Sequence, residues 1–311
     1  MSEVDALVER MREGNRRALS RILTLIENDT PDGRRALAAL YPRSGRAHTV
    51  GLTGSAGSGK STLVGALARE LRRRGKTLGI VAIDPTSPFS QGALLGDRIR
   101  MQDLTSDPQV FLRSMATRGN LGGLAPATAG LVTALDAFGK DVVLVETVGA
   151  GQDEVEVAAM ADTTVVVLTP GSGDDVQAMK AGIMEIADVL VVNKRDLPNA
   201  DLLARQLQSI VDAAPGERRT PIVRTSSALG EGIDELADAL EAHRDYVSQP
   251  AVRERHREAQ ARHQVLALAR QMLLARVVAD HSGDRKLEDL VARVARREID
   301  PHSAADALIA G

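Results

Sequence analysis

The sequence predicts an α/β protein in which helices flank a parallel β-sheet, and three observations support this fold class. From His48 to about Tyr246, strand-like runs alternate with helical ones, as in parallel strands joined by crossover helices. Several strand candidates are continuous runs of Val, Ile and Leu, which is typical of strands buried on both faces. A glycine-rich loop joins the first run to a helical stretch, where such sheets commonly carry a site.

The first 45 residues are predicted to form an N-terminal helical segment. Leu19, Ile22, Leu23 and Ile26 follow the i, i+3, i+4, i+7 spacing of one apolar helix face. Turn-forming residues at 28–33 interrupt the pattern, and a second short helix is expected from about residue 34 to residue 40. These stripes indicate packing against the main domain.

Residues 46–247 are predicted to form the main domain, with polar residues where its strands end. The carboxyl ends of parallel strands meet at one edge of a sheet, so residues placed there are expected to share a site. Asp84, Glu146, Thr169, Asn193 and Ser226 all have this position. The strand candidates are 50–53, 77–83, 110–112, 142–146, 163–168, 189–193 and 222–225.

Residues 248–311 are predicted to form a helical extension. Residues 251–279 read as one long helix, and Leu287, Leu290, Val291 and Val294 form a further apolar stripe. Asp300 and Pro301 are a plausible start for a last short helix. A tail that is polar on one side and apolar on the other needs a partner. It either folds back on its own domain or pairs with a second subunit.

Composition excludes several classes of protein. The chain has 311 residues, of which 43% are hydrophobic and 26% charged, as in an ordinary globular protein. A formal charge of −3, 2% aromatic residues and no Trp argue against nucleic acid or a membrane surface as partner. There is no Cys, which excludes disulfides and thiolate chemistry, and no apolar run of membrane-spanning length. We expect a cytoplasmic protein.

A complete Walker A loop, G-x-x-x-x-G-K-S, follows the first strand and predicts a P-loop NTPase sheet. Its backbone N–H groups and the following helix N-terminus can hold phosphates. Lys60 is expected to reach the β- and γ-phosphates, and the Ser61 hydroxyl to bind Mg²⁺. Only six residues are Lys against 33 Arg, so a lysine here is informative. The predicted nucleotide-binding residues are Gly54, Ser55, Ala56, Gly57, Ser58, Gly59, Lys60, Ser61 and Thr62.

An Asn-Lys-x-Asp sequence at the end of a later strand predicts guanine as the base. Asp196 would accept hydrogen bonds from guanine N1–H and the 2-amino group, which adenine lacks, and the Asn193 amide would read the six-position. The Lys194 stem would lie across the base. The next strand ends in a loop that would complete the pocket through backbone N–H groups of Ser227, Ala228 and Leu229.

Carboxylates at strand ends are the predicted magnesium ligands and catalytic groups. Asp84 and Glu146 can each hold Mg²⁺ directly or through water, although an Asp-x-x-Gly usually stands where Glu146 lies. Gly149 can offer its N–H to the γ-phosphate. Asp97 could approach Mg²⁺ or the attacking water, or could simply cap a helix. Gln152 is a weaker candidate for orienting the water, and Arg98, Arg100, Arg113 and Arg118 could supply transition-state charge.

These motifs, together with the segments at 83–101, 146–152 and 170–185, resemble the MeaB/ArgK family of methylmalonyl-CoA mutase-associated GTPases, in the G3E group. The resemblance runs from about residue 15 to the C-terminus. It implies a homodimer built through the C-terminal extension, and a chaperone that gates adenosylcobalamin loading of a B12-dependent acyl-CoA mutase and protects that mutase. Segment 170–185 resembles an additional switch, in which Lys180 is either a positioning residue or an ordinary surface lysine.

Three other functions remain open from the sequence. A metal-insertion GTPase is disfavoured by the absence of Cys and of clustered His. A GTP-dependent kinase would need an acceptor-binding domain, and none is evident. A scaffold that does not hydrolyse GTP is the third alternative.

Overall fold

Seven parallel strands form one sheet in the described part of the computed structural model, in the order β3-β2-β4-β1-β5-β6-β7. The structure describes residues 2–84, 101–116, 125–147, 152–171, 186–213, 219–281 and 285–309. The predicted parallel α/β fold class is therefore confirmed. The strands are β1 (His48–Thr53), β2 (Leu78–Asp84), β3 (Val110–Ala116), β4 (Val142–Glu146), β5 (Thr163–Leu168), β6 (Val189–Val192) and β7 (Ile222–Arg224).

The register places the carboxyl ends of the central strands together. Leu52 in β1 lies opposite Glu146 in β4, and Glu146 lies opposite Ala82 in β2. Thr53, the last residue of β1, pairs with Val166 in β5. Strand β1 therefore has β4 and then β2, which end in Glu146 and Asp84, on one side, and β5 followed by β6 and β7 on the other.

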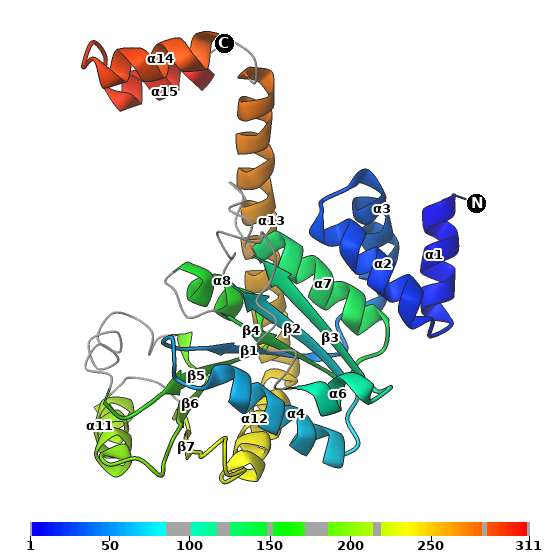
Figure 1. Cartoon of the computed structure of the whole chain (residues 1–311), viewed down its shortest axis with the longest axis vertical. Coiled ribbons are helices and arrows are strands. Elements are labelled where there is room, and N and C mark those ends of the chain that lie inside the picture. The colour runs from blue at the N-terminus through cyan, green and yellow to red at the C-terminus, as the bar shows by residue number, and fades with distance from the viewer. Residues whose placement is uncertain are drawn as a thin grey trace.

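Helices cover both faces of the sheet (Figure 1). Val142 and Leu144 of β4 pack in a core with α4 (Lys60–Arg73) and α12 (Ile233–Val247), while the alternate residues Val143 and Val145 pack against α7 (Ala125–Ala137) and α8 (Gln152–Met160). This alternation explains why the strands read as continuous apolar runs. The short α6 (Gln102–Ser106) and α11 (Ala200–Ala213) complete the layers beside β3 and β6.

Three N-terminal helices share the core of α7. They are α1 (Glu3–Arg12), α2 (Arg16–Glu27) and α3 (Pro31–Leu40), the last followed by a 3-10 turn at Tyr41–Arg43. The start of α3 differs from the sequence expectation, because it begins at Pro31 and not near residue 34. Thr30 accepts a hydrogen bond from Gly33 N–H at 3.0 Å, and proline is well tolerated in a first turn. The apparent helix breaker is thus a helix start.

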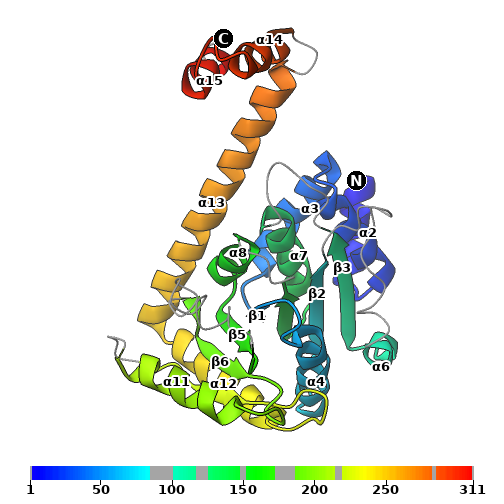
Figure 2. The same ribbon diagram turned by 60° about the vertical axis from the view of Figure 1, so that its left-hand side comes forward.

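The C-terminal residues form a long helix that leads away from the sheet. Helix α13 (Pro250–His281) carries α14 (Arg285–Ala295) and α15 (Pro301–Ile309) at its far end, as both ribbon views show (Figures 1 and 2). Asp300 caps α15 as predicted, since its carboxylate accepts from the N–H groups of His302 and Ser303 at 2.9 and 3.0 Å. None of the helices described here is both long and apolar enough to span a membrane.

Candidate nucleotide-binding site

The loop between β1 and α4 has a backbone that only glycine can adopt. Gly54, Gly57 and Gly59 have φ angles of 140°, 79° and 90°. A Cβ at Gly54 would lie 2.1 Å from the carbonyl oxygen of Val167 in β5. A Cβ at Gly59 would lie 2.6 Å from Nδ2 of Asn193. The glycines therefore let this loop approach two neighbouring strands closely, which is a requirement of a phosphate-binding loop.

The first turn of α4 carries the predicted lysine and serine. The Lys60 ammonium is buried, and it donates hydrogen bonds to the carbonyl oxygens of Gly54 and Ser55 at 2.6 and 2.8 Å. Its position at the helix N-terminus adds to a local positive potential. Lys60 therefore lies inside the curve of the loop, where an ammonium can reach phosphate oxygens.

A hydroxyl and a carboxylate meet beside this turn. Ser61 Oγ donates to Glu146 Oε1 at 2.5 Å, and Glu146 is buried at the end of β4. Both groups supply the hard oxygen ligands that Mg²⁺ prefers, so the donor set fits this ion. Asp84 ends β2 opposite Ala116, one strand further along the same edge. The side chain of Asp84 lies outside the described atoms, so its own contact with the pair stays a prediction.

Asn193 connects the phosphate loop to the base-reading loops. Its Nδ2 donates to the carbonyl oxygen of Ser58 at 2.8 Å. Its Oδ1 accepts from Thr225 Oγ1 at 3.0 Å and from the hydroxyl and N–H of Ser227 at 2.6 and 3.2 Å. Asn193 is fully buried. The two motifs, whose bonded residues lie 135 positions apart in the sequence, are therefore hydrogen-bonded into one unit.

Lys194 and Asp196, the other two defining residues of the Asn-Lys-x-Asp motif, contact the phosphate loop and the loop after β7. Lys194 has a left-handed backbone with φ of 57°, and its ammonium donates to the carbonyl oxygen of Gly57 at 2.8 Å. Asp196 Oδ1 accepts from Ser226 Oγ at 2.7 Å. That hydroxyl keeps the pKa of Asp196 below its ordinary value, so the carboxylate stays an acceptor at neutral pH. An ionised, exposed acceptor suits the N–H edge of guanine.

The loop after β7 uses two of its three candidate N–H groups internally. The N–H of Ser227 donates to Asn193 Oδ1, and the N–H of Leu229 donates to the carbonyl oxygen of Ser226 at 3.0 Å. In this described loop the geometry therefore favours the N–H of Ala228 as the group that meets the base. Thr225, which the sequence reasoning missed, supports Asn193, and its polar side chain at a strand end was the available signal.

Several predicted residues lie outside the described residues. These are Asp97, Gly149 and Lys180, with most of the segment 170–185. Arg98, Arg100 and Arg118, considered for transition-state charge, are outside them too, whereas Arg113 is described. Its guanidinium forms an ion pair with Glu27 and a hydrogen bond to Thr24 at 3.2 Å, so it fastens β3 to α2.

A glycine loop, a buried lysine and a guanine-type motif at the carboxyl edge of a parallel sheet define a P-loop GTPase. The family model described as the methylmalonyl-CoA mutase-associated GTPase MeaB matches residues 19–282. The chain belongs to this family, and the GTPase names of its relatives support GTP hydrolysis as its reaction.

Similar proteins agree with this assignment. The GTPase ArgK of Escherichia coli is 39% identical over 243 residues, covering 75% of this chain and 73% of that protein. The methylmalonic aciduria type A homolog, a mitochondrial protein of Mus musculus, is 36% identical over 260 residues, or 76% of this chain and 62% of that protein. The crystal structure of a LAO/AO transport system kinase superposes with a TM-score of 0.74 at 25% identity, covering 99% and 97% of the two chains.

Proposed function

We propose that the protein binds Mg²⁺–GTP at the carboxyl edge of β1, β4 and β6 and hydrolyses it to GDP and phosphate with the residues predicted above. The hydrogen bond between Asn193 and Ser58 carries the proposal, because it brings the phosphate and guanine motifs into one site. Lys60 is placed to hold the β- and γ-phosphates. Phosphoryl transfer depends on such positioning and on charge stabilisation at the γ-phosphate.

Ser61, Glu146 and Asp84 are the residues that would hold magnesium, with Asp97 as a further ligand from its segment. The direct contact of Ser61 with Glu146 supports the first two. When bound, Mg²⁺ would neutralise charge that develops on the phosphate oxygens. Gly149 is proposed to donate its N–H to the γ-phosphate, and water attacks that phosphorus in line with the departing GDP.

Guanine recognition is proposed to use Asp196, Asn193 and Ala228. Asp196 accepts from N1–H and the 2-amino group, and its pKa, which the Ser226 hydroxyl lowers, keeps it ionised. One amide N–H of Asn193 is taken by Ser58, so its second N–H and the backbone N–H of Ala228 would serve the six-position and ring nitrogen. The Lys194 stem would cover one face of the base.

We propose a B12-dependent acyl-CoA mutase as the protein partner, with methylmalonyl-CoA mutase as the first candidate. The support is the family description, which names mutase association, and the mouse relative named for methylmalonic aciduria. In this proposal, GTP turnover gates adenosylcobalamin loading and protects the mutase, in the cytoplasm. Segment 170–185, with Lys180, would transmit the nucleotide state.

The test is phosphate release from GTP and from ATP by the purified protein, with and without a purified mutase from the same source. Slow turnover of GTP alone, accelerated by the mutase, is the expected result. A GTP hydrolysis rate that does not change when the mutase is added would contradict the proposed partner but not the proposed GTPase activity. Transfer of labelled γ-phosphate to a protein or small molecule would instead favour a GTP-dependent kinase.

A further inference from the structure

A cavity lies at the opposite edge of the sheet from the phosphate loop. It has a volume of about 660 Å³ and is lined by the amino end of β1, including His48 and Thr49, and by the start of α13. Residues of α7 and α12 complete it. Small-molecule sites commonly have volumes of roughly 300–1,000 Å³. The cavity is therefore large enough for a ligand, and the proposed GTPase chemistry does not use it.

The charge of this cavity is positive although the chain as a whole is negative. Four arginines line it, against two aspartates, Asp136 and Asp162. Asp136 accepts hydrogen bonds from three successive backbone N–H groups at 45–47, and Asp162 accepts from Thr49 N–H at 2.8 Å. The two carboxylates are thus engaged with backbone. The arginines are Arg46, Arg244, Arg253 and Arg257.

Among the described residues, none of the four guanidinium groups has a carboxylate partner within ion-pair distance, and that of Arg257 donates to the carbonyl oxygen of Gly45 at 2.7 Å. Elsewhere the arginines of this protein pair readily, as Arg72 does with Asp107 at 2.7 Å. Burial first, and then the positive charge of Arg244, lower the pKa of His48 to about 3, so this lining group is neutral. Among the described lining residues, the cavity offers guanidinium groups without carboxylate partners, and its only carboxylates are the two engaged aspartates.

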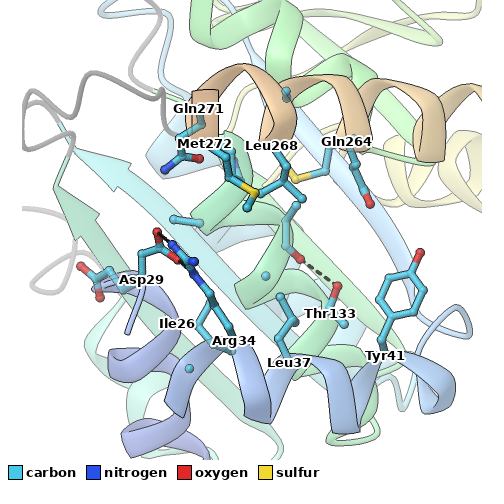
Figure 3. Close-up of a pocket in the computed structure, with 18 of the residues that line it drawn as sticks. Ile26, Asp29, Arg34, Leu37, Tyr41, Thr133, Gln264, Leu268, Gln271 and Met272 are labelled. Atoms are coloured by element: carbon cyan, nitrogen blue, oxygen red, sulfur yellow. Dashed lines mark hydrogen bonds and ion pairs between the residues drawn. The ribbon is translucent and has the colours of Figure 1, made fainter. Parts of the chain in front are cut away.

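An apolar cavity adjoins the positive one. It has a volume of about 480 Å³ between α2, α3, α7, α8 and α13 (Figure 3). The two cavities share the lining residues Tyr41, Ala129, Thr133, Met160 and Gln264. In Figure 3, Tyr41 and Gln264 lie at one end of the apolar cavity, and Leu268 and Met272 of α13 form its upper wall. A ligand can therefore place a charged head in one cavity and an apolar tail in the other.

We propose that the joined cavities bind a short-chain acyl ester of coenzyme A, with its phosphates on the arginines and its acyl group between α3, α7 and α13. Arginine is the side chain best suited to phosphate oxygens, and several guanidinium groups match a head with several phosphates. The positive cavity is the larger of the two. That proportion fits a large head with a short tail, and it does not fit a lipid with a small head and a long chain.

The test is isothermal titration of the full chain, saturated with Mg²⁺ and GDP, using butyryl-coenzyme A, coenzyme A and lysophosphatidic acid. We expect saturable binding of butyryl-coenzyme A, weaker binding of coenzyme A, and none of the lipid. Saturating GDP keeps the phosphate loop occupied. Binding that GDP abolishes would place the ligand in the nucleotide site and overturn the proposal, as would binding of the lipid alone.

Variants separate the head and tail of the ligand. Arg46→Gln combined with Arg253→Gln should weaken both coenzyme A ligands at least about tenfold, because each removes a charged hydrogen bond to phosphate. Leu268→Gln should reduce only the advantage of butyryl-coenzyme A over coenzyme A. Arg262→Gln, an exposed change on the same helix outside both cavities, is the matched control. Equal affinity in the double variant and the control would overturn the proposal. This inference does not rest on the mutase partner or on GTP turnover.

Discussion

Asn193 uses its side-chain oxygen and one amide N–H inside the protein, and so holds three loops at once. The oxygen accepts three hydrogen bonds from Thr225 and Ser227, and the N–H donates to Ser58. Guanine-reading asparagines are usually considered for their contact with the base. Here the internal contacts show that the same residue also sets the position of the phosphate loop.

Asn193→Ala should lower the free energy of unfolding even with no nucleotide present. The change leaves buried donors on Thr225 and Ser227 and a buried acceptor on Ser58, which costs roughly 2–4 kcal/mol. Urea denaturation of the nucleotide-free protein measures it. Thr225→Val removes one of these bonds and should cost about 1 kcal/mol. Equal losses of unfolding free energy in the two variants would contradict the role of Asn193 in holding the three loops together.

Lys60→Ala should lower GTP turnover by at least about 100-fold, because it removes the positive charge nearest the phosphates. Lys60→Arg should recover little activity, since a planar guanidinium does not fit the position of a compact ammonium. Single-turnover phosphate release measures both. Undiminished hydrolysis by the alanine variant would overturn the assignment of the phosphate site.

Asp196→Asn should shift base preference from guanine to xanthine. Xanthine carries an oxygen where guanine has its 2-amino group, so an amide donor replaces the lost carboxylate interaction. A mismatch that leaves a polar group of the base or of the protein unpaired in the complex lowers affinity strongly. Competition between GTP and XTP measures the change. Retained GTP preference in the variant would place guanine recognition elsewhere.

Strands β1 and β5 are joined to α12 by a buried polar chain at the edge away from the nucleotide. His48 and His243 each contact the Thr163 hydroxyl at 2.7 Å, and His243 Nε2 lies 3.2 Å from Asp188. Burial holds the pKa of His48 at about 3. These hydrogen bonds position α12 on the sheet, and they require a neutral His48.

The free energy of unfolding should therefore decrease as the pH is lowered from about 6.5, the pKa of His48 in the unfolded chain, toward about 3, its pKa in the folded protein. The unfolded chain binds a proton in this window and the folded chain does not, so the loss is about 2 kcal/mol between pH 7 and pH 5. His48→Gln should reduce that slope, measured by urea denaturation at both pH values. His302→Gln, an exposed change, is the control and should leave the pH dependence of the free energy of unfolding as in the wild type. An unchanged pH dependence in His48→Gln would show that His48 is not its cause.

The elements were largely predictable because strand burial, the glycine loop and the strand-end carboxylates each leave a local signal. The start of α3 was not, since Pro31 reads as a breaker until Thr30 is seen to cap it. It was also not predictable which of the backbone N–H groups of Ser227, Ala228 and Leu229 is left to bind the base. It depends on which N–H groups the loop uses internally, which is set by tertiary contacts with Asn193 and Ser226.

At the scale of the whole molecule, the C-terminal helices expose apolar side chains to solvent. Leu266 and Leu273 of α13 are each 62% exposed, and Ile309 of α15 is 71% exposed. Leu266 is two positions from Leu268, so the pair points to nearly opposite sides of the helix, one outward and one into the apolar cavity. We propose that the outward side, together with α14 and α15, forms a homodimer interface, since such faces are normally buried against a partner.

Leu266→Glu combined with Leu273→Glu should convert the dimer to a monomer, because it places charge in the proposed interface. Light scattering after gel filtration measures the mass. GTP affinity should stay the same, since the site lies on another part of the molecule. Leu202→Glu, an exposed change on α11, is the control. A wild-type monomer, or a variant that remains dimeric, would remove this interface.

The central place of β1 has a consequence for synthesis on the ribosome. Its two partners, β4 and β5, lie far downstream, and Gly54 packs against Val167 of β5. About 90 residues separate the end of β1 from β4, so at about 5–20 residues per second the strand stays unpaired for roughly 5–20 s. The phosphate loop cannot take its shape until β5 has emerged. Nucleotide therefore cannot assist the early steps of folding, and during this interval β1 is an unpaired apolar strand, which favours aggregation.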